Sequence, residues 1–342
     1  MTEKTTIKEI AERARVSIGT VDRVIHNRGE VSPDTRKKIK KILEEVDYEP
    51  NVFGRNLALN KVFNIVVLLP KHLKSEYWHG PVLGVEASLK NLQSLGIRVR
   101  YEYYDQNNVK SFQQSCIAIL RLKPDGILMA PVLHDESIDF LRRCHDVNIP
   151  VVLIDSDLPH ENVLTFIGQD AHKSGYLAAK LLSYGLEPSQ QFMIVSITNA
   201  SDNNFIIEER LGGFRSFFSE TGRGAPKEYS FSQEDVDLTQ NLQNIIDTSQ
   251  NIAGIFVPNS KSHLIVEALN ETYSTRIVGY DLIENNKEFL KQGKIDFIIH
   301  QRPEEQGQQG LEQLYKHIVL KQPVPRFISM PLDIITKENC EI

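Results

Sequence analysis

From Asn64 onward, the chain alternates short apolar runs with longer segments whose apolar residues recur every three to four positions. Short runs bounded by polar residues predict buried strands, and the longer pattern predicts amphipathic helices. Their alternation indicates parallel sheets covered by helices on both faces, which is an α/β fold. The predicted strands are 65–69, 99–104, 126–130, 151–154, 192–197, 254–257, 277–280 and 297–299. The predicted helices include 81–95, 111–122, 173–184, 205–220 and 262–269.

The first fifty residues instead show three short helical segments with start and stop signals. Thr6 and Glu9 have the spacing of a capping box, in which side chains satisfy the free backbone amides of a new helix. Ser17 can cap a second helix that Gly29 ends, and Ser32-Pro33 begins a third. Each segment has one apolar face: Ile7, Ile10, Ala11 and Ala14; Val21, Val24 and Ile25; Ile39, Ile42, Leu43 and Val46. The pattern predicts an all-α helix-turn-helix head closed by its third helix.

Polar and aromatic residues follow the ends of the predicted strands. Ligands of open parallel sheets bind beyond the carboxyl ends of the strands, so these residues are candidates for one binding site. Aromatic rings stack on a sugar ring, carboxylates accept hydrogen bonds from hydroxyl groups, and Arg donates in a planar fork. The set therefore suits a polyhydroxylated ligand.

Composition and charge narrow the class of protein. The 342 residues are 41% hydrophobic and 25% charged, which is typical of a globular protein of two or three domains. The net charge is −6, yet the first sixty residues hold 12 Lys and Arg against 10 Asp and Glu, so the acidic excess lies in the body. No apolar run approaches the roughly 20 residues of a membrane helix, and residues 1–8 lack the pattern of a secretory signal. Three widely spaced cysteines favour reduced thiols in a cytoplasmic protein over a disulfide framework or a zinc module.

The head resembles the DNA-binding domain of the LacI/GalR repressor family, and the body follows the same family. The matching segments are Ile7–Ala11, Ala14–Ser17, Thr20–Asn27, Val31–Arg36 and Asp47–Asn51. The resemblance implies a helix-turn-helix domain over 1–49, a hinge helix over 50–62 and a ligand-binding and dimerisation domain over 63–342.

That body is expected to be of periplasmic-binding-protein type I, with two lobes that are each a doubly wound parallel sheet. Lobe 1 is expected over about 63–166 and 298–327. Lobe 2 is expected over about 167–297 and 328–342.

The second helix of a helix-turn-helix lies in the major groove, where its first exposed residues touch base edges. Arg23 can donate two hydrogen bonds to guanine, Ile18 can contact a thymine methyl, and Gly19 offers only backbone. Gly19 and Asp22 depart from the family pattern, so we expect base preference to depend on Arg23 and the hinge. The expected phosphate contacts are Thr6, Ser17, Thr20, His26 and Asn27, with simple helix capping as the alternative for Thr6 and Ser17.

Residues 50–61 are too few to form a stable isolated helix in water. In the family this segment folds on DNA, pairs with the same segment of the dimer mate and inserts a leucine into the minor groove. Leu57 matches that leucine, and an apolar wedge of this kind kinks DNA. The alternative is a plain interdomain linker.

The resemblance of the body implies a set of ligand contacts, position by position. Asp170 is left out of this set because it matches a residue that caps a helix in the family. The alternatives are a core role for the two aromatic residues and a turn role for Asp281. The implied contacts are the aromatic residues Tyr77 and Trp78 and the polar residues Asp155, Arg210, Asn259, Asp281 and Gln301.

These features predict a transcription repressor that binds a pseudopalindromic operator as a homodimer, without a cofactor. A small carbohydrate bound between the lobes is expected to set its affinity for DNA. The alternatives are a purine or a sugar phosphate as effector, or a solute-binding protein without a regulatory role. An enzyme is disfavoured because the nucleophile-elbow, P-loop, zinc-protease and dinucleotide-binding motifs are absent from the sequence.

Overall fold

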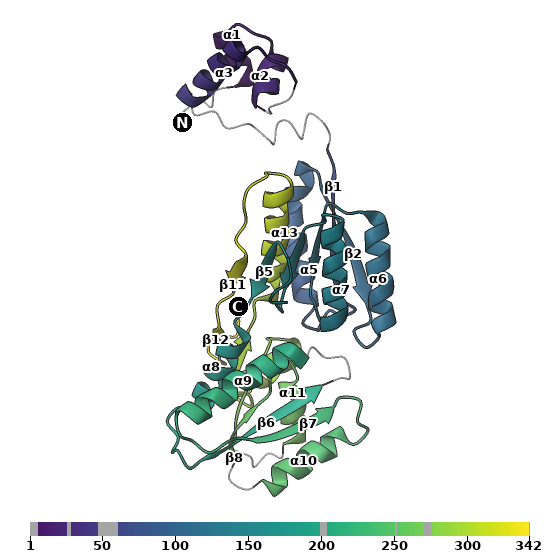
Figure 1. The fold of residues 1–342 in the computed structure, drawn as a ribbon. Coiled ribbons are helices and arrows are strands. Elements are labelled where there is room, and N and C mark those ends of the chain that lie inside the picture. The colour runs from purple at the N-terminus through teal and green to yellow at the C-terminus, as the bar shows by residue number, and fades with distance from the viewer. Residues whose placement is uncertain are drawn as a thin grey trace. The chain divides into compact units, whose positions relative to one another are not determined.

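The structure, a computed structural model, describes residues 6–25, 29–46, 61–198, 204–249, 252–269 and 275–341. The chain divides into two compact units, residues 1–60 and 61–342. Figure 1 shows both units as ribbons, and each is described here by itself.

The first unit contains the three predicted helices: α1 (Ile7–Ala14), α2 (Ile18–Ile25) and α3 (Pro33–Glu45). The capping box is present, because the Thr6 hydroxyl accepts from the Glu9 amide at 3.3 Å and the Glu9 carboxylate accepts from the Thr6 amide at 2.7 Å. Arg15, in the left-handed conformation, ends α1. A small apolar core joins the three helices through Ile10, Ala11, Ala14, Val21, Val24 and Ile39.

The second unit holds two sheets of six strands each within the residues that the structure describes (Figure 1). All pairs in the first sheet are parallel, and the second sheet has one antiparallel pair, β10 with β12. In spatial order, the first sheet is β11 (Phe327–Ser329), β5 (Thr165–Gly168), β4 (Val151–Ile154), β3 (Gly126–Met129), β1 (Phe63–Pro70) and β2 (Ile97–Tyr104). The second is β12 (Asp333–Ile335), β10 (Phe297–His300), β9 (Arg276–Tyr280), β8 (Ile252–Phe256), β6 (Gln191–Thr198) and β7 (Lys227–Ser232).

Helices flank each sheet, so that each sheet with its helices forms one lobe (Figure 1). Two helix pairs pack closely enough to require glycine: a Cβ on Gly84 would lie 1.8 Å from the Glu304 carbonyl oxygen, and one on Gly213 would lie 1.8 Å from that of His172. Lobe 1 carries α5 (His79–Leu92), η1 (Gln93–Leu95), α6 (Val109–Leu122), α7 (His134–Asp146) and α13 (Pro303–Ile318). Lobe 2 carries α8 (Ala171–Ser183), α9 (Asn204–Glu220), α10 (Leu238–Thr248), α11 (Ser262–Ala268) and α12 (Glu284–Lys291).

The chain passes between the sheets after Gly168, after His300 and after Ser329, within two or three residues of the approximate lobe boundaries expected from the sequence, because β5, β10 and β11 pair with their neighbours up to those residues. Strand β12 runs antiparallel because the chain enters the second sheet there from the opposite end. The predicted strands did not include β5, β7, β11 and β12.

The two sheets have the same strand order, so each strand of lobe 1 has a counterpart in lobe 2. Strand β4 corresponds to β9, and both are followed by an aspartate, Asp155 and Asp281, with φ of +70° and +66°. Strand β5 corresponds to β10, and both are followed by a glutamine, Gln169 and Gln301. In each sheet, two neighbouring strands are therefore followed by an aspartate and a glutamine at matching positions.

Candidate functional site

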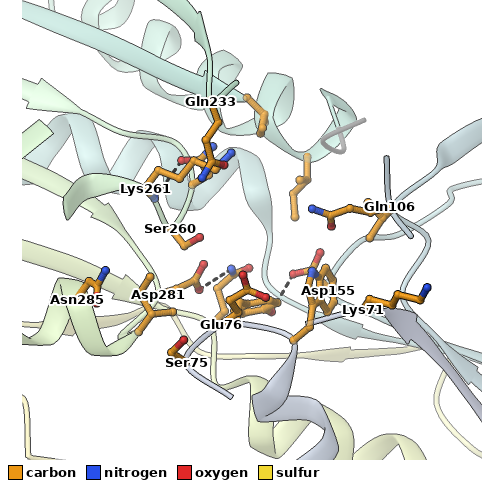
Figure 2. Close-up of a pocket in the computed structure, with 18 of the residues that line it drawn as sticks. Lys71, Ser75, Glu76, Gln106, Asp155, Gln233, Ser260, Lys261, Asp281 and Asn285 are labelled. Carbon is orange, nitrogen blue, oxygen red and sulfur yellow. Dashed lines mark hydrogen bonds between the residues drawn. The ribbon is translucent and has the colours of Figure 1, made fainter. Parts of the chain in front are cut away.

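A cavity of about 690 Å³ lies between the carboxyl ends of the two sheets (Figure 2). Its volume falls within the roughly 300–1,000 Å³ of small-molecule sites. Figure 2 shows Asp155 and Asp281 on two sides of the same space. All of the ligand contacts that the sequence implies line this cavity: Tyr77, Trp78, Asp155, Arg210, Asn259, Asp281 and Gln301.

Arg210 is the buried cation of the cavity and is only 4% exposed. Its guanidinium lies 3.8 Å from the centre of the Tyr280 ring, a cation–π contact. Nη1 donates to the Pro258 carbonyl at 2.8 Å, and Nη2 donates to Oε1 of Gln301 at 2.7 Å. Among the residues that the structure describes, buried Nε has no partner. Arg210 therefore keeps unbonded donors, Nε among them.

The carboxylates of Asp155 and Asp281 are both buried and hydrogen-bonded. Asp155 accepts from the Tyr77 hydroxyl at 2.8 Å and from the Ser156 hydroxyl at 3.0 Å. Asp281 accepts from Nε2 of Gln301 at 2.8 Å. Both are therefore held as acceptors at the cavity wall.

Burial changes the proton equilibria of these groups. It raises the pKa of Asp155 and raises that of Asp281 to about 7, while the nearby Arg210 guanidinium opposes both shifts. Burial, together with the charge of Asp155, also raises the pKa of Tyr77 well above its usual value. Tyr77 thus remains protonated and donates its hydrogen bond to Asp155.

The aromatic residues and Asn259 are held mainly by the protein itself. The rings of Tyr77 and Trp78 meet edge to face, with centroids 4.9 Å apart, and Trp78 also packs on the core of lobe 1. Nδ2 of Asn259 donates to the Ile197 carbonyl at 2.8 Å, and its Oδ1 accepts from the Lys261 amide. Each of these side chains therefore combines a structural role with a place in the cavity lining.

Several residues that line the cavity were missed by the sequence analysis. They come from loops after β1, β2, β7 and β8, whose lengths give no signal of where the loops fold back. The Asp155 amide donates to Oε1 of buried Gln306 at 2.7 Å. This bond was also missed, because Gln306 lies on α13, 151 positions away along the chain. The missed lining residues include Lys71, Asp105, Gln106, Gln233, Glu234 and Lys261.

Asp170 lies outside the cavity and caps α8, as its sequence position indicates. It is the N-cap residue of α8, and its carboxylate accepts from the Lys173 amide at 2.9 Å. This bond satisfies a free amide of the first turn.

The first unit carries an exposed surface on its second helix. Ile18 is 49% exposed, Arg23 is exposed, and a Cβ on Gly19 would meet only the Ser17 hydroxyl, at 3.8 Å. Ser17 caps α2, since its hydroxyl accepts from the Thr20 amide at 3.2 Å. The predicted contacts His26, Asn27 and Leu57 lie outside the described residues.

Comparisons with known proteins match both units. Residues 66–322 match the periplasmic binding protein domain, and residues 6–51 match the bacterial regulatory proteins of the lacI family. Within the described residues, no helix is long and apolar enough to cross a membrane.

The curated relatives include transcriptional regulators with different degrees of coverage. The ribose operon repressor of Lactococcus lactis is 25% identical over 343 residues, 98% of each chain. The HTH-type transcriptional regulator RegA of Clostridium acetobutylicum is 30% identical, over 52% of this chain and 51% of its own. DegA of Bacillus subtilis is 29% identical, over 64% and 62%. This chain thus spans about half to three-fifths of the length of RegA and DegA.

Solved structures agree with the fold. A protein from Bacteroides fragilis, described as a LacI transcriptional regulator, has a TM-score of 0.77 and 28% identity, over 82% of this chain and 98% of its own. A solute-binding protein of Burkholderia graminis in complex with D-arabinose has a TM-score of 0.73 at 17% identity, over 82% and 98%, which shows the fold alone. The chain therefore belongs to the LacI family of bacterial regulatory proteins, with a helix-turn-helix domain joined to a periplasmic-binding-protein domain.

Proposed function

We propose that this chain is a cytoplasmic repressor that binds a pseudopalindromic operator as a homodimer and responds to a small, uncharged carbohydrate. The observation that carries the proposal is the cavity between the lobes. Residues predicted from strand ends far apart in the sequence all line it, with buried carboxylates and one buried guanidinium among them. Relatives named ribose operon repressor and sucrose operon repressor support a carbohydrate effector.

The polar contacts favour an uncharged sugar over a sugar phosphate. A phosphate is best bound by a free guanidinium fork. One N–H of each terminal nitrogen of Arg210 is already bonded to a protein acceptor, so the guanidinium offers a phosphate only a partly occupied fork, with Nε among its unbonded donors. Asp155 and Asp281 lie close enough to affect Arg210 electrostatically and would repel a phosphate. Hydroxyl groups can donate to both carboxylates and accept from Nε.

The effector would act by linkage between the two lobes. Asp155 belongs to lobe 1 and Asp281 to lobe 2, so a ligand that bonds to both is bound more tightly when the lobes are closed. A difference of this kind is typically worth about 1–3 kcal/mol of coupling to the DNA-binding state. Binding to operator DNA would then change with the concentration of the sugar.

On DNA, the exposed residues of α2 would read the operator. Arg23 and Ile18 would contact bases, with Gly19 at the closest approach of the backbone. Replacing Arg23 by Ala should weaken operator binding much more than nonspecific binding, as measured by titration at fixed salt; an equal loss would make Arg23 a phosphate contact. The other proposed contacts are Thr6, Ser17, Thr20, His26 and Asn27 on the phosphates and Leu57 in the minor groove.

A thermal-shift screen of the full chain tests the effector class. Monosaccharides, polyols, sugar phosphates and purines are compared for wild type, Asp155→Asn and the control Asp146→Asn, which alters an exposed carboxylate on α7. At a hundredfold excess over Kd, a ligand stabilises by about 2.7 kcal/mol. We expect an uncharged sugar or polyol to stabilise wild type and the control but not Asp155→Asn. Stabilisation only by a sugar phosphate or a purine would contradict the proposal.

A further inference from the structure

A second, smaller cavity of about 310 Å³ adjoins the first and has no role in the proposed function. Asp155 and Ile206 line both cavities. We call the smaller cavity the side cavity. It is otherwise formed by the loop after β4, the segment around β5 where the chain first passes from lobe 1 to lobe 2, the start of α9 and the edge strand β11. The residues used below are Asp157, Phe166, Gln169, Phe205, Glu209 and Phe327.

The apolar part of the side cavity is aromatic. The rings of Phe166 and Phe327 are stacked, with centroids 5.4 Å apart and planes 18° apart. Phe327 is 48% exposed and Phe205 is 38% exposed, which is unusual for phenylalanine side chains that line a concave surface. Exposed ring faces attract flat apolar groups and cations.

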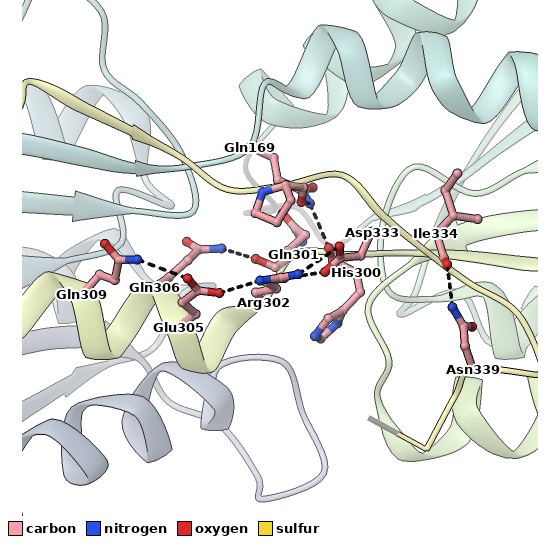
Figure 3. A network of polar contacts seen from close by, with 11 residues as sticks. Gln169, His300, Gln301, Arg302, Glu305, Gln306, Gln309, Asp333, Ile334 and Asn339 are labelled. Carbon is pink, nitrogen blue, oxygen red and sulfur yellow. Dashed lines mark hydrogen bonds and ion pairs between the residues drawn. The ribbon is translucent and has the colours of Figure 1, made fainter.

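The polar part of the side cavity consists of hydrogen-bond acceptors. Gln169 is only 7% exposed, and its Nε2 donates to the carbonyls of His300 at 2.8 Å and Pro331 at 2.6 Å (Figure 3). Its Oε1 is buried and has no partner among the described residues. Asp157 and Glu209 add carboxylates. A ligand that fits these groups must supply donors.

No lysine or arginine is among the described residues that line the side cavity. Two nearby cations act on lining carboxylates: Lys173 pairs with Asp170 at 3.0 Å, and Arg326, which donates to the carbonyls of Glu161 and Val163, lies close enough to affect Asp157 electrostatically. The ring of His134 contacts Phe205, with centroids 5.4 Å apart, but His134 does not line the cavity. Among the described residues, no cation pairs with the lining carboxylate of Glu209, so the negative charge of Glu209 is not balanced from within.

We propose that the side cavity binds a small organic cation, an amine on an aromatic or aliphatic body. The ammonium group donates to the acceptors and balances the carboxylates, while its body lies on the phenylalanine rings. An anion meets the carboxylates of Asp157 and Glu209 there, and an uncharged molecule leaves Glu209 without a cation.

Such a cation would also influence the larger cavity. Asp155 lines both cavities, and Gln169 bonds to carbonyls of the other two crossovers. The cation would therefore change the affinity of the larger cavity for its ligand, and that ligand would change the affinity of the side cavity for the cation by the same factor.

Calorimetry on the full chain with benzylamine, benzyl alcohol and phenylacetate tests the proposal. These probes share one ring and differ in charge. We expect benzylamine to bind roughly tenfold more tightly than benzyl alcohol, from the magnitude of desolvated cation–π contacts, and phenylacetate not to bind. Equal affinities for the amine and the alcohol, or no binding of the amine, would overturn the proposal.

Variants locate the bound amine. Glu209→Gln and Phe327→Leu should each weaken benzylamine binding several-fold. The matched controls Glu187→Gln and Tyr184→Leu change exposed residues away from both cavities and should leave it unchanged. Because Glu209 is exposed on α9, its variant tests the site even if Phe327→Leu does not fold.

Asn259→Ala, in the larger cavity, should also leave benzylamine binding unchanged. Loss of binding in that variant would place the amine in the larger cavity and overturn the proposal. The carbohydrate screen on the same samples reports separately on the proposed function, so the two failures are distinguishable.

Discussion

The ends of the two sheets carry the same residue types in the same places but use them differently. Asp155 and Asp281 follow corresponding strands, as do Gln169 and Gln301. Gln169 bonds to carbonyls of the crossovers, whereas Gln301 bonds to Arg210 and Asp281. A strand end thus provides a position for a polar residue. The groups that face this residue decide whether it joins the segments that connect the lobes, as Gln169 does, or lines the ligand cavity, as Gln301 does.

The helices that follow show a second difference. Asp170 caps α8 through the Lys173 amide, whereas the corresponding Arg302 of α13 has φ of +52° and makes no capping bond with its side chain. Arg302 instead pairs with Asp333 and with Glu305 (Figure 3). The start of α8 is therefore stabilised within its own helix, whereas the start of α13 is also joined to another segment by the ion pair of Arg302 with Asp333.

The largest effect is expected from removing Arg210, the buried cation of the cavity, which lies on α9 of lobe 2. Arg210→Met leaves the Pro258 carbonyl and Gln301 without their buried donor and two buried carboxyl groups without a nearby cation, and it should cost about 3–5 kcal/mol of unfolding free energy. Urea denaturation measures this cost. Arg215→Met, which removes an exposed pair with Glu228, is the control and should cost at most about 1 kcal/mol. Similar costs for both variants would contradict a special role for Arg210.

The two glutamines should separate stability from binding. Gln169→Leu leaves the carbonyls of His300 and Pro331 without a donor and should cost about 1–3 kcal/mol of stability, while carbohydrate affinity changes little. Gln301→Leu should reduce carbohydrate affinity at least tenfold, because it frees Asp281 and Arg210 from their common partner. Denaturation and calorimetry on both variants check this. An equal loss of carbohydrate affinity in both variants would contradict the different roles assigned to Gln169 and Gln301.

Asp281 should make stability depend on pH. Because burial raises its pKa from 3.8 to about 7, the native state holds a proton that the unfolded chain has lost between these values. Its contribution is full below about pH 4 and is lost as pH rises to about 7, so the free energy of unfolding falls over that range. In Asp281→Asn, the decrease in the free energy of unfolding between pH 5 and pH 8 should be smaller than in wild type by at least about 1 kcal/mol. Asp146→Asn is the control, and an unchanged slope in Asp281→Asn would refute the raised pKa.

The smallest effects concern the two helix starts. Asp170→Ala should cost about 1 kcal/mol through loss of the cap. Arg302→Ala removes ion pairs whose arginine side chain is 40% exposed and should cost less than about 1 kcal/mol. Thermal melting of both variants measures the order, and a larger cost for Arg302→Ala would show that the ion pairs outweigh the cap.

Local patterns in the sequence were enough for the head and for most strands of the body. The capping box of Thr6 and Glu9, the end of α1 at Arg15 and the cap at Ser17 involve residues a few positions apart, so local spacing predicts them. The rule that parallel strands end at one edge gave the place of the site, and the family resemblance implied the seven ligand candidates position by position. Short edge strands such as β11 and β12 were missed because three residues carry no clear periodicity.

By itself, the sequence determined the class of fold, the helix-turn-helix and the residues gathered at the strand ends. Only the tertiary structure decided where the chain changes sheet, which partner each glutamine bonds and that Phe205 and Phe327 line one cavity with Gln169. The reason is physical. Periodicity and capping depend on neighbours along the chain, whereas hydrogen-bond partners, burial and raised pKa values depend on segments brought together by pairing of distant strands.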